Sequence, residues 1–356
     1  MSSAGLGLDG THAARYGASE FLRDRHPDLS ERFPDGIIPE EIAIAFGRRH
    51  VPKLVDVIAL PDDQLPSYQR STALRYLLSL LSNQETKCEC VAYGASECLV
   101  HHLGSDDPYV RQLAALTLAS LSQLLAGRAE VVAADGIPVL TRLLQDPDPE
   151  ARAAASFCLE TLSSGPEGAA ALISCSTGVL QKEVDMLEDP YTTSEAQLSA
   201  VLTLTNCTTC DGGIYQALDA QVPPTILRLA RDDKSSGEMK VACARCLRNL
   251  ANHPYGKVQV FEADAIPVLV YFLKSDNETL QQCAAACLMG LTVEEDAKLP
   301  TVQAGARELV ALLHHDYPDV AENVLATIQN ACEHPEARRI ISELLDPEDR
   351  DLIFAD

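Results

Sequence analysis

The chain of 356 residues carries 52 acidic side chains against 28 basic ones, which gives a formal net charge of -24. This balance repels nucleic acid and anionic membrane surfaces, and it suits either a basic protein partner or simple solubility. Aromatic residues make up only 5% and Trp is absent, so we expect an aliphatic core without deep aromatic ligand pockets.

Residues 1–36 are predicted to form a flexible N-terminal arm, because His26–Gly36 is rich in Pro, Gly and charge. The N-terminal sequence has neither a signal-peptide pattern nor a Gly at position 2 for myristoylation. No apolar run reaches the ~18 residues that a membrane span needs. We therefore expect an intracellular protein that contacts neither membrane nor nucleic acid.

A loose internal repeat organises residues 37–345. DGIPVLTRLL (Asp135–Leu144) recurs as ADAIPVLVYFL (Ala263–Leu273) and as QAGARELVALL (Gln303–Leu313). One apolar column recurs at intervals of 40 to 46 residues, at Leu54, Leu99, Leu140, Leu180, Ile226, Leu269 and Leu309.

A second column follows each copy and has the form apolar-x-x-apolar. Its pairs are Leu77 and Leu80, Leu118 and Leu121, Leu159 and Leu162, Val201 and Leu204, Leu247 and Leu250, Leu288 and Leu291, and Ile328 and Ala331. Two independent columns that keep register across seven copies indicate a true structural repeat.

Each repeat has a helical apolar period. Glu150–Ser164 places its apolar residues on one face at spacings of three and four, and the DPDPE segment before it supplies an N-cap Asp. Each unit is predicted to be a short helix, a bend at Gly or a small residue, a middle helix and a longer third helix. This layout is typical of armadillo repeats, whereas HEAT repeats have two helices. We predict an all-α armadillo-repeat solenoid, a right-handed superhelix of about seven repeats, followed by an acidic tail at residues 346–356.

The cysteines do not suggest a metal or cofactor site. Cys243 and Cys246 fall in columns of small residues, where a free thiol packs as a small hydrophobe. Cys207 and Cys210 lie in TNCTTCDGG, which we predict to be a loop, so a redox or metal role remains open for this pair alone. Because no phosphate loop, GxSxG or HExxH motif occurs, we expect neither an enzyme nor a cofactor.

In armadillo proteins the third helices line a concave groove, so the residues inside each pair of the second column should border it. The partner-binding candidates there are Glu160 and Thr161, Arg248 and Asn249, and Gln329 and Asn330. Nuclear import adaptors with this fold carry arrayed Trp and Asn, and here only Asn249 and Asn330 fit that pattern. A catenin-like groove needs a basic stripe, and only Arg248 supplies that charge.

The stretch AFGRRHVPKL (Ala45–Leu54) concentrates basic residues in an acidic chain. A solvated basic end of the first repeat would account for it. The stretch also resembles the AFGRR..PKL block that opens the radial spoke head 14 family of armadillo proteins. The match covers Ala45, Phe46, Gly47, Arg48, Arg49, Pro52, Lys53 and Leu54.

This resemblance implies a non-enzymatic structural subunit of the axonemal radial spoke in motile cilia or flagella, with other spoke subunits as partners. Phe46, Arg48, Arg49 and Lys53 would then contact a neighbouring subunit, the arginines through bidentate pairs with carboxylates. The alternative is a soluble armadillo adaptor that binds a basic or amphipathic peptide in its groove.

Overall fold

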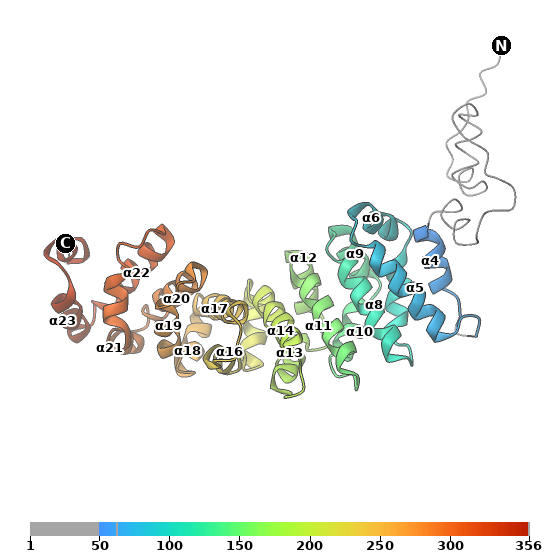
Figure 1. The fold of residues 1–356 in the computed structure, drawn as a ribbon. Helices are drawn as coiled ribbons and strands as arrows, with labels where there is room; N and C mark the ends of the chain where they lie inside the picture. The colour runs from blue at the N-terminus through green and yellow to red at the C-terminus, as the bar shows by residue number, and fades with distance from the viewer. Residues whose placement is uncertain (1–49, 62, 355–356) are drawn as a thin grey trace, which may run out of the picture. The chain divides into compact units, whose positions relative to one another are not determined.

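The computed structural model describes residues 50–61 and 63–354, which form 21 helices and no strand (Figure 1). Within these residues no helix combines the length and the apolar character that crossing a membrane requires. The chain divides into two compact units, the first ending at Gly136 and the second beginning at Ile137. The all-α prediction is confirmed.

The first unit contains two middle helices, each followed by a longer third helix. Its helices are α4 (His50–Ile58), α5 (Ser67–Leu80), α6 (Gln84–Ala92), α7 (Ala95–His102), α8 (Pro108–Leu121) and α9 (Leu125–Ala133). Helix α10 (Gly136–Leu143) begins at the boundary between the units.

The second unit continues the same alternation. Its helices are α11 (Pro149–Ser163), α12 (Pro166–Ser174), α13 (Val179–Glu188), α14 (Ser194–Cys207), α15 (Asp211–Asp219), α16 (Val222–Arg231), α17 (Gly237–Ala251), α18 (Pro254–Glu262), α19 (Ile266–Leu273), α20 (Glu278–Leu291), α21 (Glu295–Ala311), α22 (Pro318–Ala331), α23 (Pro335–Leu344) and α24 (Pro347–Phe354).

The predicted repeat pattern is confirmed in both units. The third helices α5, α8, α11, α14, α17, α20 and α22 have 14 or 15 residues, and the middle helices α4, α7, α10, α13, α16 and α19 have 8 to 10. The leading residues of the second column have no exposed surface, from Leu77 to Ile328. In the first repeat, however, Leu54 is only half-buried. Leu80 is half-buried as well, because Leu81 takes the buried position at the end of α5.

Polar side chains start most third helices of the second unit. The carboxylate of Asp148 accepts from the backbone N–H of Ala151 at 2.9 Å, which confirms the N-cap predicted for α11. Thr193, Ser236 and Asn277 cap α14, α17 and α20 in the same way. Such caps satisfy backbone donors that have no partner inside the helix.

Glycine allows the first helix of a repeat to lie directly on the end of the preceding third helix. A Cβ added to Gly168 of α12 would lie 1.8 Å from the carbonyl oxygen of Leu162. A Cβ added to Gly256 of α18 would likewise lie 2.1 Å from the carbonyl oxygen of Leu250. This close approach buries the apolar faces of adjacent helices against one another.

The last repeat departs from the others in two places. The first and middle helices run together as α21, with non-helical backbone angles only at Gly305. The acidic C-terminal segment forms α24, in which Ile353 is buried and the ring of Phe354 lies 4.6 Å from the guanidinium of Arg338.

Candidate functional site

The basic stretch near the N-terminus lies mostly outside the described residues. Phe46, Arg48 and Arg49 fall in that part, so their proposed contacts stay predictions. Lys53 is described and lies exposed on α4.

The other six predicted site residues all lie on third helices of the second unit. Glu160 and Thr161 belong to α11, Arg248 and Asn249 to α17, and Gln329 and Asn330 to α22. Gln329 is exposed and the other five are half-buried. The structure therefore distributes them as three pairs along the third helices, which we call the third-helix surface, and it does not gather them into one cluster.

The asparagines of this surface tie consecutive third helices together. The Asn249 amide donates to the carbonyl oxygen of Thr205 on α14 at 3.1 Å, and the Asn330 amide donates to that of Met289 on α20 at 3.4 Å. The guanidinium of Arg248 donates to Asn249 Oδ1 at 3.3 Å. A bound segment could use these amides only by replacing contacts within the protein.

Glu160 presents a partly desolvated carboxyl group. Its Oε2 accepts a hydrogen bond of 2.7 Å from the hydroxyl of Ser199 on α14. Burial raises the pKa of Glu160, the Ser199 hydrogen bond lowers it, and the charge of Glu238 raises it further.

Sequence reasoning missed a buried carboxyl group beneath this surface. Glu183 of α13 has no exposed surface, and its Oε2 accepts from the Ser156 hydroxyl of α11 at 3.1 Å. Its Oε1 finds no hydrogen-bond partner among the described residues. Burial raises the pKa of Glu183 to about 8, the Ser156 hydrogen bond lowers it, and the charge of Glu160 raises it.

The sequence did contain a signal for Glu183. It stands three residues after Leu180 of the first apolar column, where the two following repeats have Leu229 and Phe272. Both of these side chains are buried. A carboxyl group in a column of large apolar residues indicates a position that departs from ordinary core packing.

A polar hollow opens where α14 and α17 begin and α16 ends. Its volume is about 480 Å³, within the range of roughly 300–1,000 Å³ that ligand pockets occupy. We call it the carboxylate hollow, and its lining includes Glu195, Leu198, Leu229, Asp232, Glu238 and Met239. None of these six was singled out from the sequence, because they come from different helices of two successive repeats.

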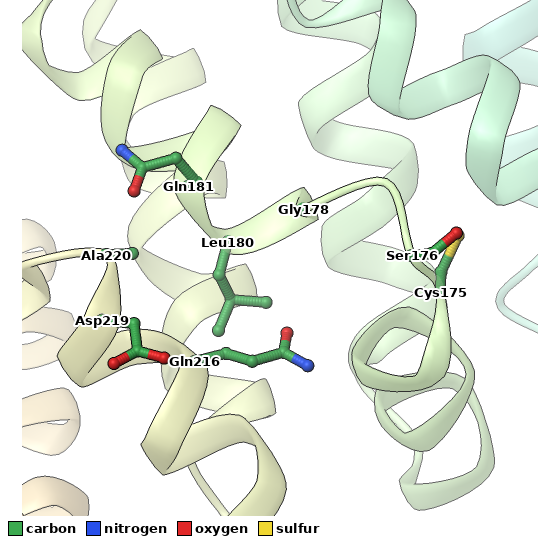
Figure 2. Close-up of a pocket in the computed structure, with 8 residues that line it drawn as sticks. All are labelled: Cys175, Ser176, Gly178, Leu180, Gln181, Gln216, Asp219 and Ala220. Carbon is green, nitrogen blue, oxygen red and sulfur yellow. The ribbon is translucent and has the colours of Figure 1, made fainter.

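A second hollow, of about 290 Å³, lies between the loop before α13 and the end of α15 (Figure 2). Figure 2 shows Gln216 and Asp219 of α15 beside Leu180 of α13, with Cys175 and Ser176 across the opening. Only Cys175 and Asp219 among its lining residues have ionisable side chains. The lining therefore lacks the paired acid and base that hydrolytic chemistry uses.

The cysteines of the second unit are mostly packing residues. Cys243 and Cys246 are fully buried, as their column predicts, and burial raises the pKa of the Cys246 thiol to about 12. The prediction of a loop for the other pair is wrong at Cys207, which is buried as the last residue of α14, while Cys210 is exposed before α15. Within residues 50–61 and 63–354, no group of three or more His, Cys, Asp and Glu is placed to hold a metal ion.

Comparison with known proteins agrees with this geometry. A family model of HEAT repeats matches residues 96–178. The crystal structure of an engineered protein aligns with 83% of this chain, with a TM-score of 0.75 and 28% sequence identity. The alignment covers 72% of that engineered protein. A designed armadillo repeat protein in complex with the peptide (KR)4 aligns with 68% of this chain, with a TM-score of 0.61 and 24% sequence identity. The alignment covers all of that designed protein. The fold is an armadillo/HEAT-type repeat solenoid.

One natural relative of this solenoid is the U-box domain-containing protein 18 of Arabidopsis thaliana. The two are 22% identical over 245 residues, which is 69% of this chain. The match spans only 35% of the relative, so the chain corresponds to about a third of that protein.

Proposed function

We propose that this protein is a non-catalytic scaffold that binds segments of other proteins along its third-helix surface. The observation that carries the proposal is the set of exposed and half-buried polar side chains on alternate third helices, α11, α17 and α22, from Glu160 to Asn330. Extended surfaces built from stacked repeats suit protein ligands, because each repeat adds a few contacts. A structure of similar fold holds a peptide, the designed armadillo protein with (KR)4.

We further propose that the scaffold is a subunit of the axonemal radial spoke in motile cilia or flagella. The support is the resemblance of Ala45–Leu54 to the opening block of the radial spoke head 14 family. The partners would be other spoke subunits, and Arg48 and Arg49 would meet carboxylates on one of them.

Fractionation of motile ciliated cells tests this function. Cilia carrying the tagged protein would be isolated, stripped of membrane with detergent and washed with increasing salt. We expect the protein to remain with the axoneme and to leave together with spoke subunits only at high salt. Recovery in the soluble cell-body fraction would contradict the spoke assignment.

The second candidate function is a soluble adaptor that binds a basic segment reversibly. The net charge of -24 and the partly buried carboxyl of Glu160 favour it. An adaptor would release its partner on dilution and would not stay with washed axonemes, so the same fractionation separates the two functions.

A further inference from the structure

Two small hollows share the exposed side chain of Tyr271, near the end of α19. Their volumes are about 230 Å³ and about 250 Å³. Both are below the roughly 300 Å³ at which pockets for drug-sized ligands begin, so each suits a single side chain. The smaller one, which we call the lysine hollow, has Lys240, Tyr271, Lys274, Ser275, Asn277 and Leu280 in its lining.

The lysine hollow is positively charged although the chain as a whole is acidic. Lys240 and Lys274 contribute two ammonium groups, and none of the described residues that line the hollow is acidic. Glu238, at the start of α17, lines the carboxylate hollow instead. Because a net charge of -24 repels anions at long range, an anion can gain affinity for this protein only from cations gathered at one place.

Both lysines keep donors for a ligand. The Nζ of Lys240 lies 5.8 Å from the centre of the Tyr271 ring, and within residues 50–61 and 63–354 no carboxylate pairs with it. The Nζ of Lys274 lies 2.9 Å from Oε1 of Glu308, which occupies one of the three donors of an ammonium group. Since Lys274 is exposed and Lys240 is half-buried, an incoming group can reach the hollow from solvent.

A hydroxyl and an amide add uncharged donors to the hollow. The Oγ of Ser275 accepts from the backbone N–H of Asn277 at 3.1 Å, so its own proton remains to be donated. The Oδ1 of Asn277 accepts from the backbone N–H of Leu280 at 3.1 Å, which leaves the side-chain NH2 as a donor. The hollow therefore combines two positive charges with further donors, and this is the chemistry that binds a multiply charged oxyanion.

We propose that the lysine hollow binds the phosphoryl group of a phosphorylated serine or threonine in an extended segment of a partner protein. A phosphoryl group carries a charge of about -1.5 to -2 near pH 7 and three acceptor oxygens. It therefore matches two ammonium groups and their uncharged neighbours better than a single carboxylate does. The second hollow, which has Ala230, Pro267 and Val268 in its lining, would hold an apolar side chain of the same segment.

The site is separate from the residues on which the proposed function rests. The two hollows lie at the ends of α16 and α19 and at the starts of α17 and α20. Lys240 precedes Arg248 of the third-helix surface by about 12 Å along the axis of α17. The inference thus adds a phosphorylation-dependent partner to the scaffold, and it requires neither the third-helix surface nor the radial spoke.

The test uses the full-length protein and three peptide arrays that differ only at a fixed central residue, which is phosphoserine, glutamate or serine. The flanking positions are degenerate, so no partner sequence is assumed. The variant Lys240→Met with Lys274→Met removes both cations of the hollow, and Lys240→Arg with Lys274→Arg keeps them. The matched control, Lys53→Met with Lys182→Met, removes two lysines on the middle helices α4 and α13. Thermal unfolding checks that each variant is folded, and Lys240→Met alone serves if the double variant is not.

We expect the phosphoserine array to retain at least about tenfold more protein than the other two arrays, most strongly where apolar residues flank the phosphoserine. The methionine variant should lose at least about tenfold of this retention, and the arginine variant and the control less than about threefold.

Equal retention on the phosphoserine array and on either other array would overturn the phosphoryl specificity. Equal losses in the methionine variant and the control would show attraction by overall charge and would remove the hollow as the site. Absence of retention on the phosphoserine array would contradict the inference outright. None of these results bears on retention in the axoneme, so the proposed function succeeds or fails separately.

Discussion

Two regions of the second unit use the same repeat geometry with opposite chemistry. Between α11, α13 and α14, the position three residues after Leu180 is filled by the buried Glu183, and Ser156 supplies its hydrogen bond. Between α17, α19 and α20, the equivalent position is Phe272, which has no exposed surface. The difference agrees with the rule that a buried carboxyl group costs less free energy where a neighbouring helix provides a polar partner, as Ser156 does for Glu183.

The two regions also differ in how neighbouring repeats are joined at their first helices. Lys257 of α18 pairs with Glu294 at 3.6 Å, and Lys298 of α21 pairs with Glu333 at 2.6 Å. The equivalent positions of α12 and α15 are Ala169 and Ile214, which cannot form ion pairs. The region around Glu183 therefore combines a buried carboxyl group with fewer ion pairs between its first helices.

The largest effect is expected when the region of α17, α19 and α20 is given a buried carboxyl group like that of the region of α11, α13 and α14. Phe272→Glu should lower the free energy of unfolding by at least about 4 kcal/mol, because it removes a buried ring and inserts a carboxyl group without a serine partner. Urea unfolding followed by circular dichroism measures the change. Tyr271→Glu places the same group one residue earlier on an exposed position and should change stability by less than about 1 kcal/mol. Equal losses in both variants would contradict the comparison.

The reverse exchange, an apolar residue in place of Glu183, should stabilise the region of α11, α13 and α14. Glu183→Leu restores the residue type found at Leu229 and removes an unpartnered buried oxygen. We expect a gain of about 2–3 kcal/mol at neutral pH, the range seen when buried ionisable groups are replaced by apolar ones. A lower urea midpoint than that of the unmodified protein would mean that the Ser156 hydrogen bond outweighs the burial of the carboxyl group.

The pH dependence of stability should identify Glu183 directly. Its pKa rises from 4.5 to about 8 on folding, so the folded protein holds the proton more tightly than the unfolded chain. The contribution to stability is fully present below pH 4.5 and is lost as the pH rises through about 8. Relative to Glu183→Gln, the unmodified protein should lose up to about 1.4 kcal/mol per pH unit between pH 5 and 7.

The measurement is urea unfolding of both proteins at a series of pH values. Groups that do not interact with Glu183 cancel in the difference, whereas Glu160 is coupled to it and contributes through that coupling. A difference that does not vary with pH would show that Glu183 is ionised in the folded protein.

The smallest expected effect concerns the ion pairs that join first helices of neighbouring repeats. Lys298→Met removes the contacts with Glu295 and Glu333 and should lower the free energy of unfolding by about 0.5–1 kcal/mol, because both acidic partners are exposed. The loss should shrink at 1 M NaCl, where salt screens the pair in the unmodified protein. A loss that does not change with salt would indicate packing of the lysine stem as its cause.

The repeat architecture was predictable because its signal lies in local patterns. Column residues such as Leu159 and Leu247 recur at the spacing of one face of a helix, and Asp148 and Gly178 mark where helices begin. The candidate site was predictable only in part. Glu160 and Asn249 fall on the third helices as expected, but their partners Ser199 and Thr205 belong to the neighbouring repeat.

Cys207 illustrates why the rest was not predictable. The sequence TNCTTC has the composition of a loop, yet Cys207 closes α14 because the first helix α15 packs onto its carbonyl. A Cβ on Gly213 would lie 1.9 Å from the carbonyl oxygen of Cys207. Local composition does not report such a contact between successive helices.

The sequence by itself determined the class of fold, the length of the repeat, the register of its two apolar columns and the acidic character of the surface. These properties depend on periodicity and composition, which are local or additive along the chain. Only the tertiary structure decided that Glu183 is buried against Ser156, that the Ser199 hydroxyl of the next third helix reaches Glu160, and that a hollow opens where α14 and α17 begin. Those features depend on distances between side chains from different repeats, and stacking alone fixes such distances.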